Sequence, residues 1–150
     1  SVIRPGDVQR MTAGTGVRHS EQNASSTERV HLLQIWILPN AEDLTPGYEQ
    51  KAFSEAERRG QLRLIASGDG RDDSVHLNQD VSLFASILDA GREIERAMDP
   101  VRYAWIQVAR GAVTVNGENA QQGDGLIIVA ESDLKIRAEE PSEVLFFDLA

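Results

Sequence analysis

Short apolar runs separated by turn-forming residues constrain the fold of this chain more than any other feature. In the last third, five such runs follow one another: YAWIQVA, AVTVNG, LIIVA, LKIRA and EVLFFDL. Together they are rich in β-branched and aromatic residues, and brief turns join them. Asn116-Gly117 fits a tight hairpin, because both residues tolerate the positive φ of a type I′ turn. The pattern predicts an all-β sandwich or barrel.

The middle of the chain carries further strand-like runs. VHLLQIWIL, Val30 to Leu38, is nearly all apolar, so it predicts a strand that is buried on both faces and ends before Pro39. LRLIA, SVHL and VSLFASIL have the same character. Trp36 and Trp105 lie inside apolar runs, and we expect both in the core.

One short helix is predicted at Ser54 to Arg59. Ser54 and Glu57 have the spacing of a capping box, in which each side chain binds a free backbone N–H at the helix start. Gly60 supplies the stop. The preceding stretch, Pro39 to Gly47, is polar and contains both turn formers, so it is the best linker in the chain.

Composition excludes several classes of protein. The 150 residues contain 15 Lys and Arg against 24 Asp and Glu, a formal charge of −9, which argues against a direct nucleic-acid ligand. No cysteine is present, so disulfides and thiolate chemistry are excluded. No apolar run approaches the roughly 20 residues that cross a bilayer, and no membrane association is expected. A cytoplasmic location is expected.

A histidine and a carboxylate stand out in the stretch GTGVRHSEQN. In an extended chain His19 and Glu21 project from the same face, because strand side chains alternate with period two. Two convergent ligands of this kind suit a divalent metal. On spacing alone, a solvated edge with both side chains in water remains open. Gly14 and Gly16 precede the pair and give the backbone conformational freedom.

Two Gly-Asp turns suggest an internal repeat. RPGD at Arg4 to Asp7 leads into VQRM, and QQGD at Gln121 to Asp124 leads into GLIIV. Each turn opens a strand, which is consistent with two related β modules.

With these turns and the His-bearing stretch, the chain resembles the cupin superfamily, whose second motif runs from a glycine to Gly-x-x-His-x-x-x-Asn. Here Gly6 starts the motif and Gly16 to Asn23 completes it; Gly14 replaces the usual proline, and the spacing from Gly6 is two residues longer than the common form. GDVQRMTAGTGVRHSEQN followed by HLLQIWILP resembles the pirin family, which includes bacterial quercetin 2,3-dioxygenases. RYAWIQVARGAVTVNG and SEVLFFDL resemble its second barrel.

The resemblance implies two cupin barrels, with one metal in the first. The expected organisation is a partial N-terminal barrel over 1–47, a connecting segment with the short helix over 48–82, and a complete, metal-free C-terminal barrel over 83–150. The family binds its metal through a His-x-His pair, then a His and a Glu. His19 and Glu21 match the last two ligands, whereas the His-x-His pair is absent from this sequence. The chain therefore resembles the back part of a pirin, with an incomplete metal site.

The function that the resemblance implies is metal-dependent cleavage of a flavonol, with Fe(II) as the expected metal and Glu21 as the catalytic base. The intact protein would be a quercetin 2,3-dioxygenase, and this chain alone is expected to be inactive. The alternative is a metal- or redox-responsive regulator that binds a protein partner and catalyses nothing. Open barrel edges also predict a homodimer or strand exchange.

Overall fold

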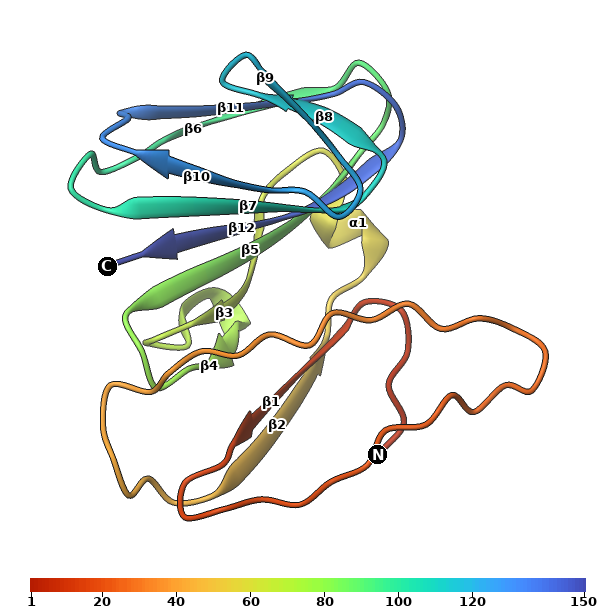
Figure 1. Ribbon diagram of the computed structural model, residues 1–150, viewed down its shortest axis with the longest axis vertical. Helices are drawn as coiled ribbons and strands as arrows, with labels where there is room; N and C mark the ends of the chain where they lie inside the picture. Colours follow the sequence, from red (N-terminus) through yellow and green to blue (C-terminus); the bar gives the residue numbers. More distant parts are fainter.

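Twelve strands in three sheets dominate the computed structural model, which describes residues 1–150 (Figure 1). The largest sheet has six strands in the order β10-β7-β12-β5-β3-β4. Its strands, in chain order, are β3 (Arg63–Ser67), β4 (Val75–His76), β5 (Val81–Leu88), β7 (Tyr103–Arg110), β10 (Gly125–Val129) and β12 (Ser142–Leu149). All pair antiparallel except β3 with β4. The prediction of an all-β fold with one short helix is confirmed.

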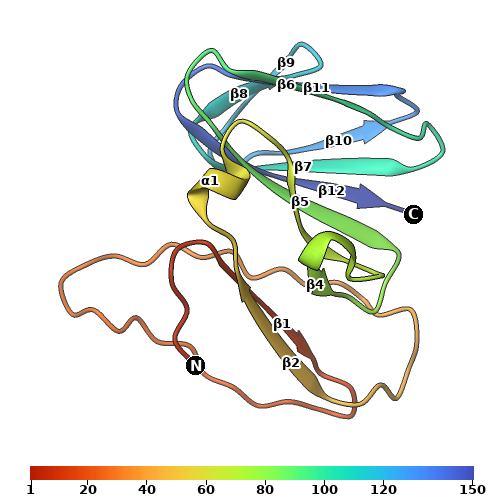
Figure 2. The same ribbon diagram turned by 180° about the vertical axis from the view of Figure 1, so that it is seen from behind.

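A four-stranded antiparallel sheet faces the larger sheet and completes the C-terminal barrel (Figures 1 and 2). It runs in the order β6-β11-β8-β9 and consists of β6 (Glu93–Ala97), β8 (Ala112–Val115), β9 (Glu118–Gln121) and β11 (Asp133–Ala138). The predicted Asn116-Gly117 hairpin joins β8 to β9, and both residues have positive φ. The side chains of β11 alternate: Leu134 and Ile136 are buried and their neighbours are exposed, as expected of a sheet with one face in water.

The main hydrophobic core lies between these two sheets. It contains 15 buried residues, and Phe146, Ile106 and Ile136 are completely enclosed. Phe84 and Phe146 pair across β5 and β12 and stack, with ring centroids 5.3 Å apart. Burial of this apolar surface is the dominant force that holds the barrel together.

A second core covers the opposite face of the six-stranded sheet. It consists of Phe53, Ile65, Ala66, Val75, Leu83, Ala85 and Leu145. Because β5 is apolar on both faces, VSLFASIL reads as a continuous apolar run instead of an alternating one. The sheet therefore needs cover on this side as well.

The short helix α1 (Glu55–Arg58) is where it was predicted. Ser54 Oγ accepts a hydrogen bond from Glu57 N at 3.3 Å, and Glu57 Oε2 accepts one from Ser54 N at 2.7 Å, which completes the capping box. The helix also carries buried Arg58, whose Nη1 donates to Glu143 Oε1 at 2.7 Å. This ion pair fixes α1 to β12 of the barrel.

A two-stranded ribbon contains the only strands of the first 52 residues: β1 (Asp7–Thr12) and β2 (Gly47–Ala52). It follows the predicted turn at Arg4 to Asp7, in which Asp7 N donates to Arg4 O at 2.9 Å. One face of the ribbon contacts β4: His76 N donates to Glu49 Oε2 at 3.0 Å, and Arg10 Nε donates to His76 O at 3.0 Å. Figure 1 shows the ribbon below the barrel, with the long connecting segment around it.

The prediction of a buried strand at Val30 to Leu38 is wrong. The segment forms no regular strand, and Trp36 is 88% exposed, so its predicted core position is wrong too. The physical reason is that a strand requires a hydrogen-bonded neighbour. No backbone group of Val30 to Leu38 makes a backbone–backbone hydrogen bond. The composition of the segment is typical of a strand, but composition does not show whether a neighbouring strand is present to pair with it.

The predicted division into 1–47, 48–82 and 83–150 stays a prediction. Two strands of the predicted connecting segment, β3 and β4, lie in the same sheet as β5, β7, β10 and β12. No helix of the chain is long and apolar enough to cross a bilayer.

Candidate metal-binding site

The predicted ligand pair lies in the irregular segment that follows β1. Gly14 has φ +51°, and a Cβ there would lie 2.0 Å from Leu44 O, so only glycine fits this turn. Gly16 has φ +138° and open space around it, which makes its requirement purely conformational. Gly16 N donates to Ala13 O at 2.8 Å and closes the turn. The chain then runs past the ribbon with His19 and Glu21.

His19 and Glu21 face each other as their spacing predicted. His19 Nε2 lies 4.0 Å from Glu21 Oε1, and the two side chains are 37% and 31% exposed. Neither residue belongs to a regular strand. The pair is therefore convergent and accessible, and it is not enclosed in a barrel.

A hydrogen-bond chain that the sequence analysis missed holds Glu21 against the ribbon. Gln9 Nε2 donates to Glu21 Oε1 at 3.3 Å, and Tyr48 Oη donates to Gln9 Oε1 at 3.1 Å. Gln9 pairs with Gln50 across the ribbon, and Tyr48 Oη also reaches Gln50 Oε1. The available signal was the alternation in β1, which places Gln9 on the face away from the Arg10–Glu49 pair.

The residues present fit half of a metal site. Neighbouring donors around an ion lie about 3 Å apart, since metal–ligand distances are roughly 2.0–2.2 Å. Closing the His19–Glu21 pair by about 1 Å would bring both donors to one ion. Glu21 also has the supporting hydrogen bond that ligating carboxylates need. No group of three or more His, Cys, Asp or Glu side chains in the chain could hold an ion, however.

The other two histidines lie elsewhere. His31 is exposed, and its Nδ1 accepts a hydrogen bond from Arg110 Nε at 3.5 Å. His76 is on β4, where its backbone binds the ribbon. Asn23, at the end of the motif, stabilises the turn after the pair, because its side chain bonds Ser25 N and Glu28 O. None of the three joins His19 and Glu21.

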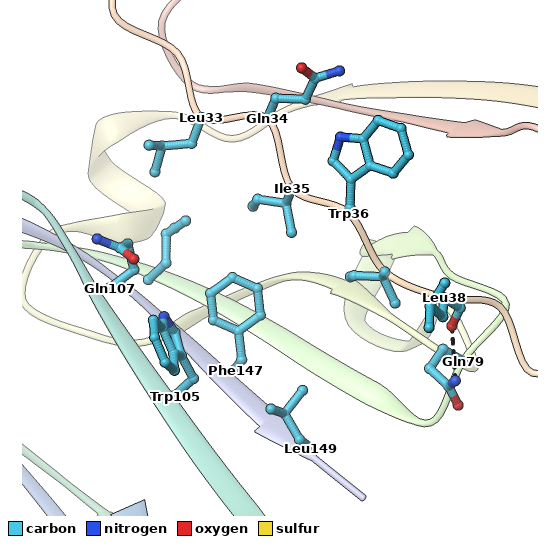
Figure 3. Close-up of a pocket in the computed structure, with 12 residues that line it drawn as sticks. Leu33, Gln34, Ile35, Trp36, Leu38, Gln79, Trp105, Gln107, Phe147 and Leu149 are labelled. Carbon is cyan, nitrogen blue, oxygen red and sulfur yellow. Dashed lines mark hydrogen bonds between the residues drawn. The ribbon is translucent and has the colours of Figure 1, made fainter. Parts of the chain in front are cut away.

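An apolar groove of about 540 Å³ separates residues 33–38 from the outer face of the six-stranded sheet (Figure 3). Ile35 points toward Phe147 of β12, and Trp105 of β7 lines the floor. Trp36 points the other way, which agrees with its exposure. Trp105, predicted as core, is half-buried here.

Comparison with known proteins places this architecture among the cupins. A family model described as the quercetinase C-terminal cupin domain matches residues 64–149, and a model described as pirin matches residues 1–37. The chain belongs to the pirin family. The resemblance inferred from the motif around His19 is thereby confirmed.

Named relatives agree with the family. The chain is 45% identical over 147 residues to a quercetin 2,3-dioxygenase of Escherichia coli strain K12, which covers 98% of this chain. It is 41% identical over 146 residues to a putative quercetin 2,3-dioxygenase of Pseudomonas aeruginosa, which covers 97% of it. In both alignments the chain spans 62% of the length of the relative.

Solved structures give the same result. The crystal structure of YhhW from Escherichia coli superposes with a TM-score of 0.88 at 45% identity, covering 97% of this chain and 61% of that one. A second structure of this bacterial pirin, in complex with nickel(II), superposes with a TM-score of 0.87, covering 96% and 61%. YhaK, also from Escherichia coli, is 26% identical with a TM-score of 0.61, covering 75% and 48%.

Proposed function

We propose that this chain supplies two metal ligands, His19 and Glu21, to an enzyme of the quercetin 2,3-dioxygenase type that cleaves a flavonol. The observation that carries the proposal is the convergence of the two side chains at 4.0 Å, within the segment that matches the pirin model. The remaining ligands come from residues outside these 150. Nickel bound to YhhW supports a divalent ion, and we propose Fe(II) as the native one.

When bound, the ion supplies a Lewis acid and redox centre. The chain itself supplies orientation and a base. Gln9 fixes Glu21 Oε1, which leaves Glu21 Oε2 without a partner in the chain. In the proposed reaction, Oε2 accepts the proton of the flavonol hydroxyl, because a carboxylate within hydrogen-bond reach of that proton can act as general base. Tyr48 keeps Gln9 in place.

The test uses a protein of the full length of the relatives and compares two site variants with one control. We expect His19→Ala and Glu21→Gln each to lower flavonol turnover by about 100-fold or more. His19→Ala should also weaken nickel binding measured by calorimetry. His31→Ala is the control, because His31 is exposed and lies outside the pair. Turnover and nickel affinity that survive both site variants would remove the proposal.

The 150-residue chain itself should behave differently. With two ligands it should bind nickel weakly and turn over no flavonol, because first-row metals in oxygenases are held by three or more protein ligands. Flavonol turnover by this chain alone would contradict the assignment of the missing ligands to residues outside it.

We also propose a partner for Val30 to Leu38, namely a second copy of the chain. Nine successive residues there carry no formal charge and no backbone–backbone hydrogen bond, and only Leu38 O is engaged, by Gln79 Nε2 at 2.9 Å. Antiparallel pairing of two such segments would satisfy their backbone groups.

A further inference from the structure

Arg96 is an arginine that points into the C-terminal barrel. It lies on β6, where Ile94 and Arg96 are half-buried and their neighbours are exposed. Ile94 and Met98, on either side of it, pack against the main core. Its Cζ is 4.2 Å from the ring centroid of Phe84 and 5.6 Å from that of Phe146. Figures 1 and 2 show β6 in the sheet opposite the strands β5 and β12 that carry these rings.

The guanidinium of Arg96 has no acceptor in the protein. Five arginines are at least half-buried, and four of them donate to carboxylate, hydroxyl or carbonyl oxygens: Arg10, Arg58, Arg63 and Arg102. The guanidinium of Arg96 makes no hydrogen bond and no ion pair; its only recorded contacts are with the rings of Phe84 and Phe146. No fully buried side-chain nitrogen or oxygen lacks a partner, so the N–H groups of Arg96 reach solvent. The guanidinium therefore keeps five N–H donors without a protein acceptor, next to two stacked rings.

The surroundings of Arg96 form a polar mouth at one end of the barrel, made of Arg71, Ser82, Arg102 and Asp148. Two hydrogen-bonded pairs are formed among these four residues. Arg71 Nη2 donates to Ser82 Oγ at 2.8 Å, and Arg102 Nε donates to Asp148. Burial lowers the pKa of Arg96, and the positive charge of Arg71 adds to this effect, whereas the negative charge of Asp148 opposes it. Asp148 is hydrogen-bonded to Arg102, so the guanidinium of Arg96 has no carboxylate hydrogen-bonded to it.

We propose that this mouth binds a small organic carboxylate with an apolar body, and that Arg96 is its anchor. A carboxylate can accept two parallel hydrogen bonds from one guanidinium, and such charge-assisted pairs are the strong ones. The half-buried side chains of Ile94 and Met98 offer an apolar wall for the rest of the ligand. The site uses neither His19 nor Glu21, so it goes beyond the proposed dioxygenase site and gives the second barrel a binding role of its own.

Benzoate is the probe, titrated into isotope-labelled protein at constant ionic strength while the Nε–Hε resonance of Arg96 is followed by NMR. We expect a saturable shift of that resonance. Acetate, which keeps the charge and lacks the ring, should bind more weakly. Benzyl alcohol, which keeps the ring and lacks the charge, should leave the resonance in place.

Arg96→Met keeps the apolar stem and removes the charge, and it should raise the Kd for benzoate by about tenfold or more. Arg92→Met is the matched control, because Arg92 is exposed, has no side-chain acceptor and immediately precedes β6. It should leave the Kd unchanged. The thermal midpoint of ligand-free Arg96→Met should fall only slightly, because the substitution removes the contact of the guanidinium with the Phe84 ring and no hydrogen bond.

Two results would overturn the proposal. If Arg96→Met and Arg92→Met weaken benzoate binding equally, benzoate is attracted to the positive charge of the surface in general and not to Arg96. Loss of thermal stability in Arg96→Met, with no benzoate-dependent shift in the wild-type protein, would mean that Arg96 serves only to cover Phe84.

Discussion

Gly111 shows how a single backbone position can be fixed from far along the chain. It has φ +78° between β7 and β8. A Cβ at this position would lie 2.4 Å from Ser142 Oγ and 2.5 Å from Pro141 O. Ser142 Oγ cannot retreat without loss, since it bonds both the N–H and the C=O of Ala112. Only a residue without a side chain fits here.

Gly111→Ala should lower the free energy of unfolding by about 2–5 kcal/mol, the sum of left-handed strain and overpacking. Gly117→Ala is the matched control: its φ is +92°, but nothing lies within 4 Å of the added Cβ. It should cost only the strain, about 1–2 kcal/mol. Urea unfolding of the two variants measures the difference, and equal losses would show that the contact with Ser142 is unimportant.

Features that depend on residues close in sequence could be predicted, whereas features that depend on residues far apart in the chain could not. The capping box of Ser54 and the Asn116-Gly117 turn depend on neighbours within three residues, and both are confirmed. The requirement at Gly111 depends on Ser142, 31 positions away. The convergence of His19 and Glu21 follows from local spacing, but the contribution of Gln9 needed the ribbon to fold first. The metal-ligand and base roles of His19 and Glu21 stay predictions.

At the scale of elements, the β1-β2 ribbon depends on a few charged groups for its attachment. Glu49 accepts from His76 N at 3.0 Å and pairs with Arg10 at 3.3 Å and with Lys51 at 3.4 Å. Desolvation raises the pKa of Glu49, but the hydrogen bonds from His76, Arg10 and Lys51 outweigh it. The pKa of Glu49 therefore lies below its ordinary value.

This shift gives the ribbon a defined response to acid. A carboxylate with a depressed pKa stabilises the folded state above its unfolded pKa, about 4.3, and loses that contribution as the pH falls through its folded pKa. We expect the β1 and β2 amides to lose hydrogen-exchange protection below pH about 4, before those of β5 and β12. Glu49→Gln keeps an acceptor for His76 N and should flatten this pH dependence, at a loss of about 1 kcal/mol of ribbon stability near neutral pH. An unchanged acid response in the variant would assign it to other carboxylates.

Elements were predictable from sequence where apolar residues dominate. The runs that became β5, β7 and β12 were identified, because their burial leaves a plain pattern. The strands β2, β6 and β9 were missed, since GYEQKA, EIERA and ENAQ carry charged or amide side chains and depend on their neighbours for pairing. Val30 to Leu38 failed for the opposite reason: it has the composition of a strand and no partner.

At the scale of the whole molecule, the buried core lies in the last two thirds of the chain, whereas most of the exposed large apolar side chains lie in the first third. Every buried residue lies between Phe53 and Phe146. The first third exposes Val30, Leu32 and Trp36 among other apolar side chains, and such a patch on a monomer indicates an interface. Self-association through Val30 to Leu38 is the consequence that can be measured.

We expect light scattering to give twice the chain mass of 16.5 kDa, with dimerisation favoured by added salt because each copy carries a charge of −9. Trp36→Lys should make the protein monomeric, since a lysine side chain in an edge segment opposes strand pairing. Val101→Lys serves as control, because Val101 is also highly exposed but lies in the turn before β7. A wild-type protein that stays monomeric at every concentration, or a control that also dissociates, would contradict the pairing of this segment.

The six-stranded sheet, apolar on both faces, has a consequence for protein engineering. Leu83, Leu145 and Phe147 cover its outer side and belong to a different core from Phe84 and Phe146 on the same strands. A designer who wished to express the C-terminal barrel by itself would have to replace such outward side chains with polar ones, or the freed face would aggregate in water.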